Sequence, residues 1–509
     1  MEYERKNHHE NILSEDNNKF FLEDLNEQKL SLRGKKISKI IQIKRKNILE
    51  QTKYSPDIID KSLQFHILKF SSSYERIILY LRASDDKIQN YILNQINTYF
   101  KYNEPDIKEQ KIIIEGQFLE ILLNLGIKYL TENNKKNIFL IILIFINIQI
   151  YQEGNSDYIK ILYRYKFLEF YNNCFINSNS EDIMNEIILL LYHISKIDED
   201  VNIVILTSKV FESILNLLSN EDKDLELSEN IIKLIVSCLN LSKEEELNDR
   251  EIKIINKCLT VLKNESENPE QNIQQQCYKG FYMLSKLNDK YEFNEKMIRL
   301  KIPKLIIENK MKNIQILFYA LKTLTNILTV TDDFLEGINM KEIIDFYNHV
   351  LLSFDADDKL VNIIFKGLYN IADSKYINFI KSCIIWKEEN IQKYFNKNEK
   401  IQILFLKIIK YIINMGNHES LKFIYETKVF EYLIYLMSNS KLSKKIVVKI
   451  MKLVDNYLSR FKEKEKNDIE YIIIFNKFIN WINLFCYENN DEDEILEYIK
   501  EKYKPFNII

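Results

Sequence analysis

The chain has 509 residues, of which 46% are apolar, but it contains only 8 glycines and 5 prolines. Hairpins and crossover turns use Gly and Pro at many positions, so this composition disfavours an all-β or α/β fold and predicts an all-α protein. With 71 basic against 74 acidic residues, a net charge of −3, there is no global field to attract nucleic acid or an anionic membrane.

The N-terminal segment divides by charge. Residues 1–28 are polar, acid-rich and without hydrophobic periodicity, which predicts a disordered acidic tail. Residues 29–53 form a basic stretch in which Ile37, Ile40 and Ile41 recur at helical spacing among Lys and Arg. We predict a basic amphipathic helix there, followed by a linker over 54–73. Such a helix suits an acidic groove on a protein partner. The alternative is a solvated or nucleic-acid-binding tail.

From about Tyr74 to residue 509, an apolar helical segment closed by a polar turn recurs at intervals of 46, 45, 48, 40, 44, 41 and 45 residues. A fixed period of roughly 40 to 47 residues is typical of solenoids of stacked helical repeats. Each repeat reads as a short helix, a second helix and a longer third helix, and the last unit has the polar outer side of a cap. The closing positions are Asn147, His193, Cys238, Lys286, Asn326, Asn370, Tyr411 and Asn456.

The sequence carries no pattern that indicates catalysis, metal binding or membrane insertion. The six cysteines never approach CxxC spacing, and no glycine-rich phosphate loop or nucleophile with a basic partner is present. The most apolar run, 138–146, is about half the length needed to cross a bilayer. We therefore predict no cofactor and no enzymatic activity.

Four segments resemble the importin alpha family, the armadillo adaptors of nuclear import. ALKTLTNILTVTDDFLEGI (320–338) is similar to the family's sixth repeat, and FKGLYNIADSKYINFI (365–380) is similar to its seventh. The run from Asp455 to Tyr503 resembles the closing repeat. LRGKKISKIIQIKRKN (32–47) resembles the second half of the importin-beta-binding segment.

The resemblance implies a right-handed armadillo-type superhelical solenoid of about ten three-helix repeats, preceded by a basic N-terminal helix. It implies an adaptor that shuttles between cytoplasm and nucleus, with basic nuclear localisation signals as cargo, an importin beta-type carrier, and an export receptor at the C-terminal repeats. The implied cargo-binding residues are Asn147, Asp198, Lys322, Asn326, Asp332, Asp333 and Asn370. The implied carrier-binding residues are Arg33, Lys35, Lys36, Lys39, Lys44, Arg45 and Lys46.

The chain departs from the family at the positions that hold tryptophan on the third helices. These positions contain Leu143, Leu189, Leu234, Tyr282, Lys366 and Lys407. Leucine has no π face for a cargo cation, and the two lysines would repel a basic signal. Alternatives therefore stay open. The chain is either an import adaptor or an armadillo scaffold for other partners, and the asparagines are either cargo ligands or left-handed helix C-caps. The cluster Lys44, Arg45 and Lys46 is also a candidate pseudo-cargo.

Overall fold

The computed structural model is all-helical within the part of the chain that it describes. The predicted acidic tail (1–28), the basic helix (29–53), most of the linker (54–73) and Asp198 lie outside the described residues. The described residues are 67, 69–83, 85–151, 157–158, 160–161, 166–177, 180–197, 200–218, 224–241, 246–287, 292–309, 313–330, 332–354, 357–415, 418–439, 442–460, 469–488 and 501–503.

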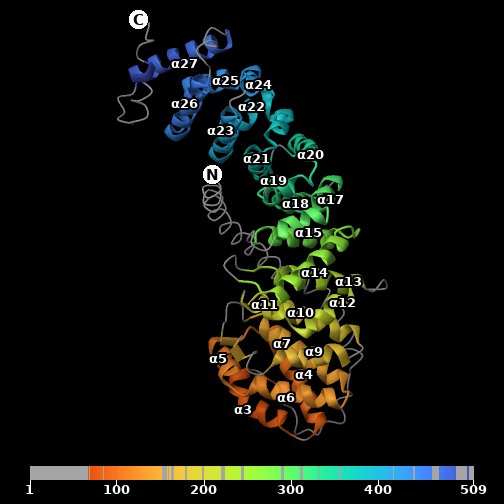
Figure 1. Cartoon of the computed structure of the whole chain (residues 1–509). Coiled ribbons are helices and arrows are strands. Elements are labelled where there is room, and N and C mark those ends of the chain that lie inside the picture. Colours follow the sequence, from red (N-terminus) through yellow and green to blue (C-terminus); the bar gives the residue numbers. More distant parts are fainter. Residues whose placement is uncertain are drawn as a thin grey trace. The chain divides into compact units, whose positions relative to one another are not determined.

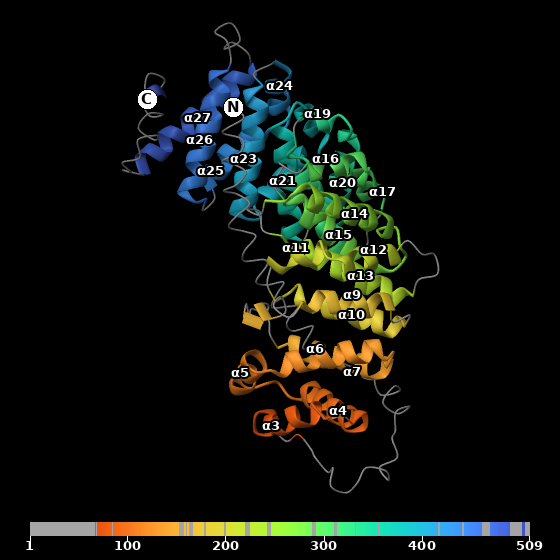
Figure 2. The ribbon, with the colours of Figure 1, turned by 60° about the horizontal axis from the view of Figure 1, so that its bottom comes forward.

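The third helices of successive repeats pack side by side, each against the next; Figure 1 labels each of them, and Figure 2 shows the same row from another direction. They are α4 (Asp86–Tyr102), α7 (Lys135–Gln149), α10 (Glu181–Ile194), α13 (Leu225–Cys238), α15 (Gln271–Ser285), α18 (Ile314–Ile327), α21 (Asp358–Ala372), α23 (Glu399–Asn414) and α26 (Lys444–Ser459).

The remaining helices pack around this row. The longer ones are α3 (Phe70–Leu81), α6 (Phe118–Thr131), α9 (Phe167–Asn177), α12 (Lys209–Leu217), α14 (Asp249–Glu265), α17 (Ile302–Glu308), α20 (Met340–Ser353), α22 (Glu388–Phe395), α25 (Val429–Asn439) and α27 (Ile469–Glu488). The short ones that open or link repeats are α5 (Ile107–Glu115), α11 (Asp200–Leu206), α16 (Phe293–Arg299), α19 (Asp332–Leu335), η4 (Ile377–Ser382), η5 (Ile384–Trp386) and α24 (His418–Glu426).

The helices α11, α12 and α13 show the predicted repeat, with a short first helix of 7 residues, a second of 9 and a third of 14. The physical basis is a periodic apolar stripe on each helix, which is buried only when the next repeat covers it. In α21, for example, Leu360, Ile364 and Leu368 recur every four residues and are fully or almost fully buried.

Asp and Asn residues start many of the third helices. The Asp357 carboxylate accepts hydrogen bonds from the backbone N–H groups of Lys359, at 2.8 Å, and Leu360, at 3.2 Å. Asn398 caps α23 through Ile401 N–H at 3.0 Å. These side chains satisfy backbone donors that have no partner within the helix, so each helix begins at a defined residue. No helix among the described residues is both long and apolar enough to span a membrane.

Candidate protein-interaction face

The third helices leave one stripe of side chains partly open to solvent. On α18, Gln315, Lys322 and Asn326 are exposed or half-exposed, whereas Leu321 and Leu324 are buried. We call the corresponding stripe on α10 to α26 the third-helix face. Its members are Asn185, Leu189, His193, Glu229, Lys233, Ser237, Gln275, Lys279, Tyr282, Gln315, Tyr319, Lys322, Asn326, Asn362, Lys366, Ile403, Lys407, Tyr411, Asn414, Val448, Lys449, Lys452 and Asn456.

Hydrogen bonds between neighbouring third helices run along this layer, and we call them the polar ladder. They join Asn147 Nδ2 to Asn97 Oδ1 at 2.9 Å, Ser195 Oγ to Ser237 Oγ at 2.7 Å, Asn326 Nδ2 to Ser285 Oγ at 2.9 Å, Asn370 Nδ2 to the Thr325 carbonyl at 2.8 Å, and Asn456 Nδ2 to Asn414 Oδ1 at 3.1 Å. The ladder fixes the register between repeats, because each amide or hydroxyl has its partner on the adjacent repeat.

The predicted asparagines are therefore in contact with other repeats. Asn147 and Asn370 are only 5% and 8% exposed, and Asn326 is half-exposed. The alternative of a left-handed C-cap is wrong for all three, because each lies inside its helix and has a negative φ. Asn326 and Asn370 lie on adjacent helices, whereas Asn147 lies several repeats away on α7.

Lys322 lies on the third-helix face one turn before Asn326. Its Nζ is 4.4 Å from the ring centroid of Phe318 and 4.7 Å from that of Tyr282, and it lies 3.4 Å from the Tyr282 hydroxyl. The ammonium group is thus held over aromatic faces, an arrangement that lowers its cost of leaving bulk water.

The two acids of the predicted cargo site open α19. Asp332 accepts a hydrogen bond from the backbone N–H of Lys375 at 3.3 Å, which ties it to the next repeat, and Asp333 is exposed. The remaining acid of the prediction, Asp198, lies in a part of the chain that the structure does not describe.

Two of the positions aligned with the family's tryptophans and one closing position do not lie on the third-helix face. Leu143, Leu234 and Cys238 are buried in the core, and Lys233 and Ser237 stand on the face instead. On α13, the positions chosen from the sequence are one residue away from those that lie on the face. Each residue turns a helix by about 100°, so a one-residue shift moves a side chain from the face into the core.

The sequence analysis also missed a recurrence that the structure makes visible. Lys322, Lys366, Lys407 and Lys449 occupy the face of four successive third helices, at intervals of 44, 41 and 42 residues. The intervals match the repeat period, so this pattern could have been read from the sequence as a charged row. From the sequence, Lys366 and Lys407 were interpreted as lost tryptophans that would repel a basic signal, and Lys322 as a cargo-binding residue.

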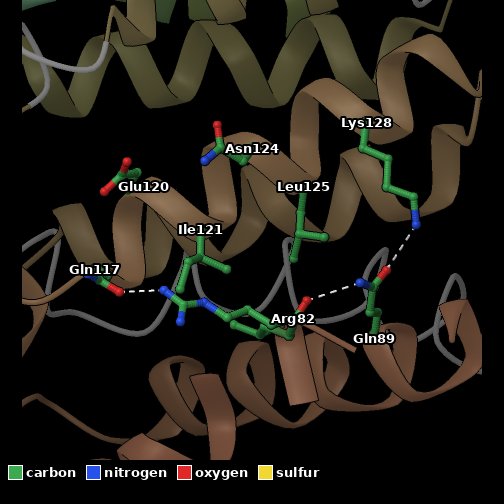
Figure 3. Close-up of a pocket in the computed structure, with 9 residues that line it drawn as sticks. Arg82, Gln89, Gln117, Glu120, Ile121, Asn124, Leu125 and Lys128 are labelled. Carbon is green, nitrogen blue, oxygen red and sulfur yellow. Dashed lines mark hydrogen bonds between the residues drawn. The ribbon is translucent and has the colours of Figure 1, made fainter. Parts of the chain in front are cut away.

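The structure also has a pocket of about 360 Å³ between the link that joins α3 to α4 and the helix α6 (Figure 3). Its polar side chains bond one another. Arg82 donates to Gln117, Lys128 donates to Gln89 Oε1 at 3.3 Å, and Gln89 donates to the Leu81 carbonyl at 3.0 Å. The first two bonds join adjacent repeats and the third lies within one repeat, so we assign the pocket a packing role. The described residues also contain no cluster of three potential metal ligands.

The cysteines of the described helices yield a testable property. Cys174, Cys238, Cys258, Cys277 and Cys383 are free and buried. Burial raises the pKa of the Cys174, Cys258 and Cys383 thiols from 9.0 to about 12. The thiolate is the reactive form, so these thiols are inert at neutral pH in the folded chain.

We expect a Cys486→Ser variant to react with a thiol reagent at pH 8 only after unfolding, when five thiols per chain become labelled. Between pH 9 and 12 the unfolded chain holds fewer thiol protons than the folded chain, so the free energy of unfolding falls as pH rises through this range. Stoichiometric labelling of the native protein at pH 8 would show that these cysteines are not buried.

The fold and this face define the class of protein as a helical repeat solenoid with three-helix, armadillo-type repeats. A crystal structure of an engineered protein from the Northeast Structural Genomics Consortium is similar over 85% of this chain and 98% of its own, with a TM-score of 0.63 and 14% identity. A designed armadillo repeat protein in complex with the peptide (KR)4 matches 46% of this chain and 95% of its own, with a TM-score of 0.39 and 12% identity. At its low identity, the first likeness shows the fold alone. No protein-family model and no curated protein matches the chain.

Proposed function

We propose that this chain is a protein-interaction scaffold that binds extended polypeptide segments along its third-helix face. The observation that carries the proposal is the continuity of this face over successive repeats, held in register by the polar ladder. A solenoid presents an elongated surface, and a long chain of another protein can contact several repeats at once. Rigid repeats also lower the entropic cost of binding because the surface is ordered in advance.

A displayed library of random sixteen-residue peptides, selected on the full chain, tests this proposal. We expect the selected peptides to lose binding to a set of single variants on the face, among them Leu189→Asp and Tyr282→Ala. The matched control is Leu352→Asp on α20, because Leu352 is 70% exposed and lies outside the third helices. Peptides that bind equally to every variant, or that are sensitive to Leu352→Asp alone, would place the interaction elsewhere.

The narrower function is that of a nuclear import adaptor, in which cytoplasmic cargo with a basic signal is linked to an importin beta-type carrier and an export receptor returns the adaptor from the nucleus. This proposal is supported by the resemblance of residues 320–338, 365–380 and 32–47. The lysines at 366 and 407 weigh against a conventional basic cargo, because like charges across an interface disfavour binding. An adaptor role would therefore depend on Asn326, Asp332 and Asp333 or on repeats nearer the N-terminus.

Carrier binding separates the two functions. The adaptor function predicts that an importin beta-type carrier retains the full chain, and that replacing Lys44, Arg45 and Lys46 together by Ala weakens this retention. It also predicts that the triple variant binds a basic cargo peptide more tightly, if the cluster acts as a pseudo-cargo. Failure of the carrier to retain the intact chain would eliminate the adaptor function and leave the scaffold function untouched.

A further inference from the structure

The C-terminal end of the third-helix face carries a concentration of positive charge. Lys407 and Lys410 on α23 lie beside Lys449 and Lys452 on α26, the next third helix. We call these four residues the basic patch. Lys407 and Lys449 are half-exposed, and Lys410 and Lys452 are exposed.

The carboxylates near the basic patch are already in other interactions. Glu399 on α23 pairs with Lys445 at 3.4 Å. Asp455 on α26 pairs with Lys502 at 2.6 Å and accepts a bond from the Tyr503 hydroxyl at 2.7 Å. Asp373, which follows α21, interacts with the Tyr411 hydroxyl. In the described part of the chain, none of the four lysines of the patch forms an ion pair.

The lysines of the patch disfavour one another's charge. Burial, Lys449 and Lys410 lower the pKa of Lys407, and burial, Lys445, Lys452 and Lys410 lower the pKa of Lys449. A bound anion would relieve this repulsion, because opposite charge favours the protonated form of each lysine. Within the described part of the chain, no ion pair offsets the repulsion among these four lysines.

We propose that the basic patch binds an acidic, extended polypeptide segment of a partner protein. This inference rests on the proposed function, since it names the class of partner for one end of the same face. The lysines supply charge complementarity to Asp and Glu side chains. The nearby Asn414 and Asn456 amides bond each other at 3.1 Å, and their oxygens accept from Arg460, so their remaining N–H groups can donate to a peptide backbone.

The chemistry of the patch favours a peptide over a nucleic acid. Base stacking needs open aromatic faces. Tyr369, however, is buried, with its ring 5.6 Å from Tyr411 and the Lys407 ammonium 5.1 Å from its centroid. Arginine is the residue best suited to bidentate contact with phosphates, but the patch itself is formed by lysines, and the nearby Arg460 guanidinium already donates to Asn414 and Asn456.

Fluorescence anisotropy on the full chain at low ionic strength tests the proposal, with a labelled sixteen-residue peptide of alternating Glu and Ser as the probe. We expect binding by the wild type and a loss of at least about tenfold in affinity for Lys407→Gln/Lys449→Gln, from removal of two interfacial charges. The matched control is Lys341→Gln/Lys422→Gln, which removes the same charge from exposed lysines on α20 and α24. This control should bind as the wild type does.

Three results would overturn the proposal. The first is an equal loss in both double variants, which would indicate a non-specific charge effect. The second is tighter binding of a Lys–Ser peptide than of the Glu–Ser peptide. The third is preferential binding of a sixteen-nucleotide oligothymidine that depends on Lys407 and Lys449. If library-selected peptides of other composition still depend on Leu189 and Tyr282, the scaffold function survives each of these results. Thermal unfolding of both double variants checks that they remain folded.

Discussion

Glu109→Ala should allow the first repeats to unfold separately from the rest, because it lowers their local free energy of unfolding by roughly 3–5 kcal/mol. Glu109 is 1% exposed and its carboxylate serves three elements at once. It accepts hydrogen bonds from the Tyr99 hydroxyl at 2.8 Å on α4, from Ser71 N–H at 3.2 Å on α3, and from Asp106 N–H at 3.3 Å in the capping box of α5. Alanine leaves the buried Tyr99 hydroxyl and the part-buried Ser71 N–H group without their acceptor, which costs more than the bonds contributed.

Hydrogen exchange measured by mass spectrometry is suited to this prediction, because a solenoid unfolds repeat by repeat. We expect faster exchange across α3, α4 and α5 and unchanged exchange in α23 and α26. The isosteric control is Glu109→Gln, which retains one acceptor oxygen and should show a smaller effect in the same helices. Uniform acceleration along the whole chain would argue against a local role for Glu109, and unchanged exchange in α3 to α5 would argue that the carboxylate is dispensable.

Asn370→Leu should weaken the junction between α18 and α21 by about 1–3 kcal/mol. The Asn370 amide donates to the Thr325 carbonyl at 2.8 Å, and both residues are buried. Because α18 ends at Ile327, that carbonyl belongs to the last turn and has no partner within its own helix. Leucine has a similar volume and no donor, so the main change is a buried acceptor without a bond.

Urea unfolding followed by two local probes tests this expectation. A fluorophore in α10 and another in α23 should report coincident transitions in the wild type and separated ones in Asn370→Leu, since stability in a repeat array is a sum of repeat and interface terms. The control is Asn326→Ala, which removes a half-exposed bond of 2.9 Å to Ser285 and should have a weaker effect. Coincident transitions with an unchanged midpoint in Asn370→Leu would contradict a coupling role for this amide.

The helices and their period could be predicted from local information. The third helices at 225–238 and 314–327 follow the apolar spacing closely, because burial of a helical stripe needs a repeat of three or four residues in the sequence itself. The prediction of a short first helix and a longer third helix is confirmed in the repeat formed by α11, α12 and α13.

The candidate site was less predictable, and the reason is geometric. Cys238 and Ser237 are adjacent in the sequence, but only the packing of α13 against α10 and α15 decides which of them is buried. The same holds for Leu234 and Lys233. The apolar pattern shows that a helix has a buried stripe, but it does not show which residue is the last buried one at the border of that stripe. Errors of one residue in assigning the exposed face are therefore expected.

By itself, the sequence determined the all-helical class, the repeat of about 40 to 48 residues and the long third helix that closes each repeat. Tertiary structure alone decided which polar groups pair between repeats. Asn370 bonds Thr325, which is 45 positions away in the sequence. Lys407 lies near Lys449, which is 42 positions away. Such contacts depend on how two packed helices are rotated and shifted relative to each other. The packing of side chains across the whole interface determines that rotation and shift.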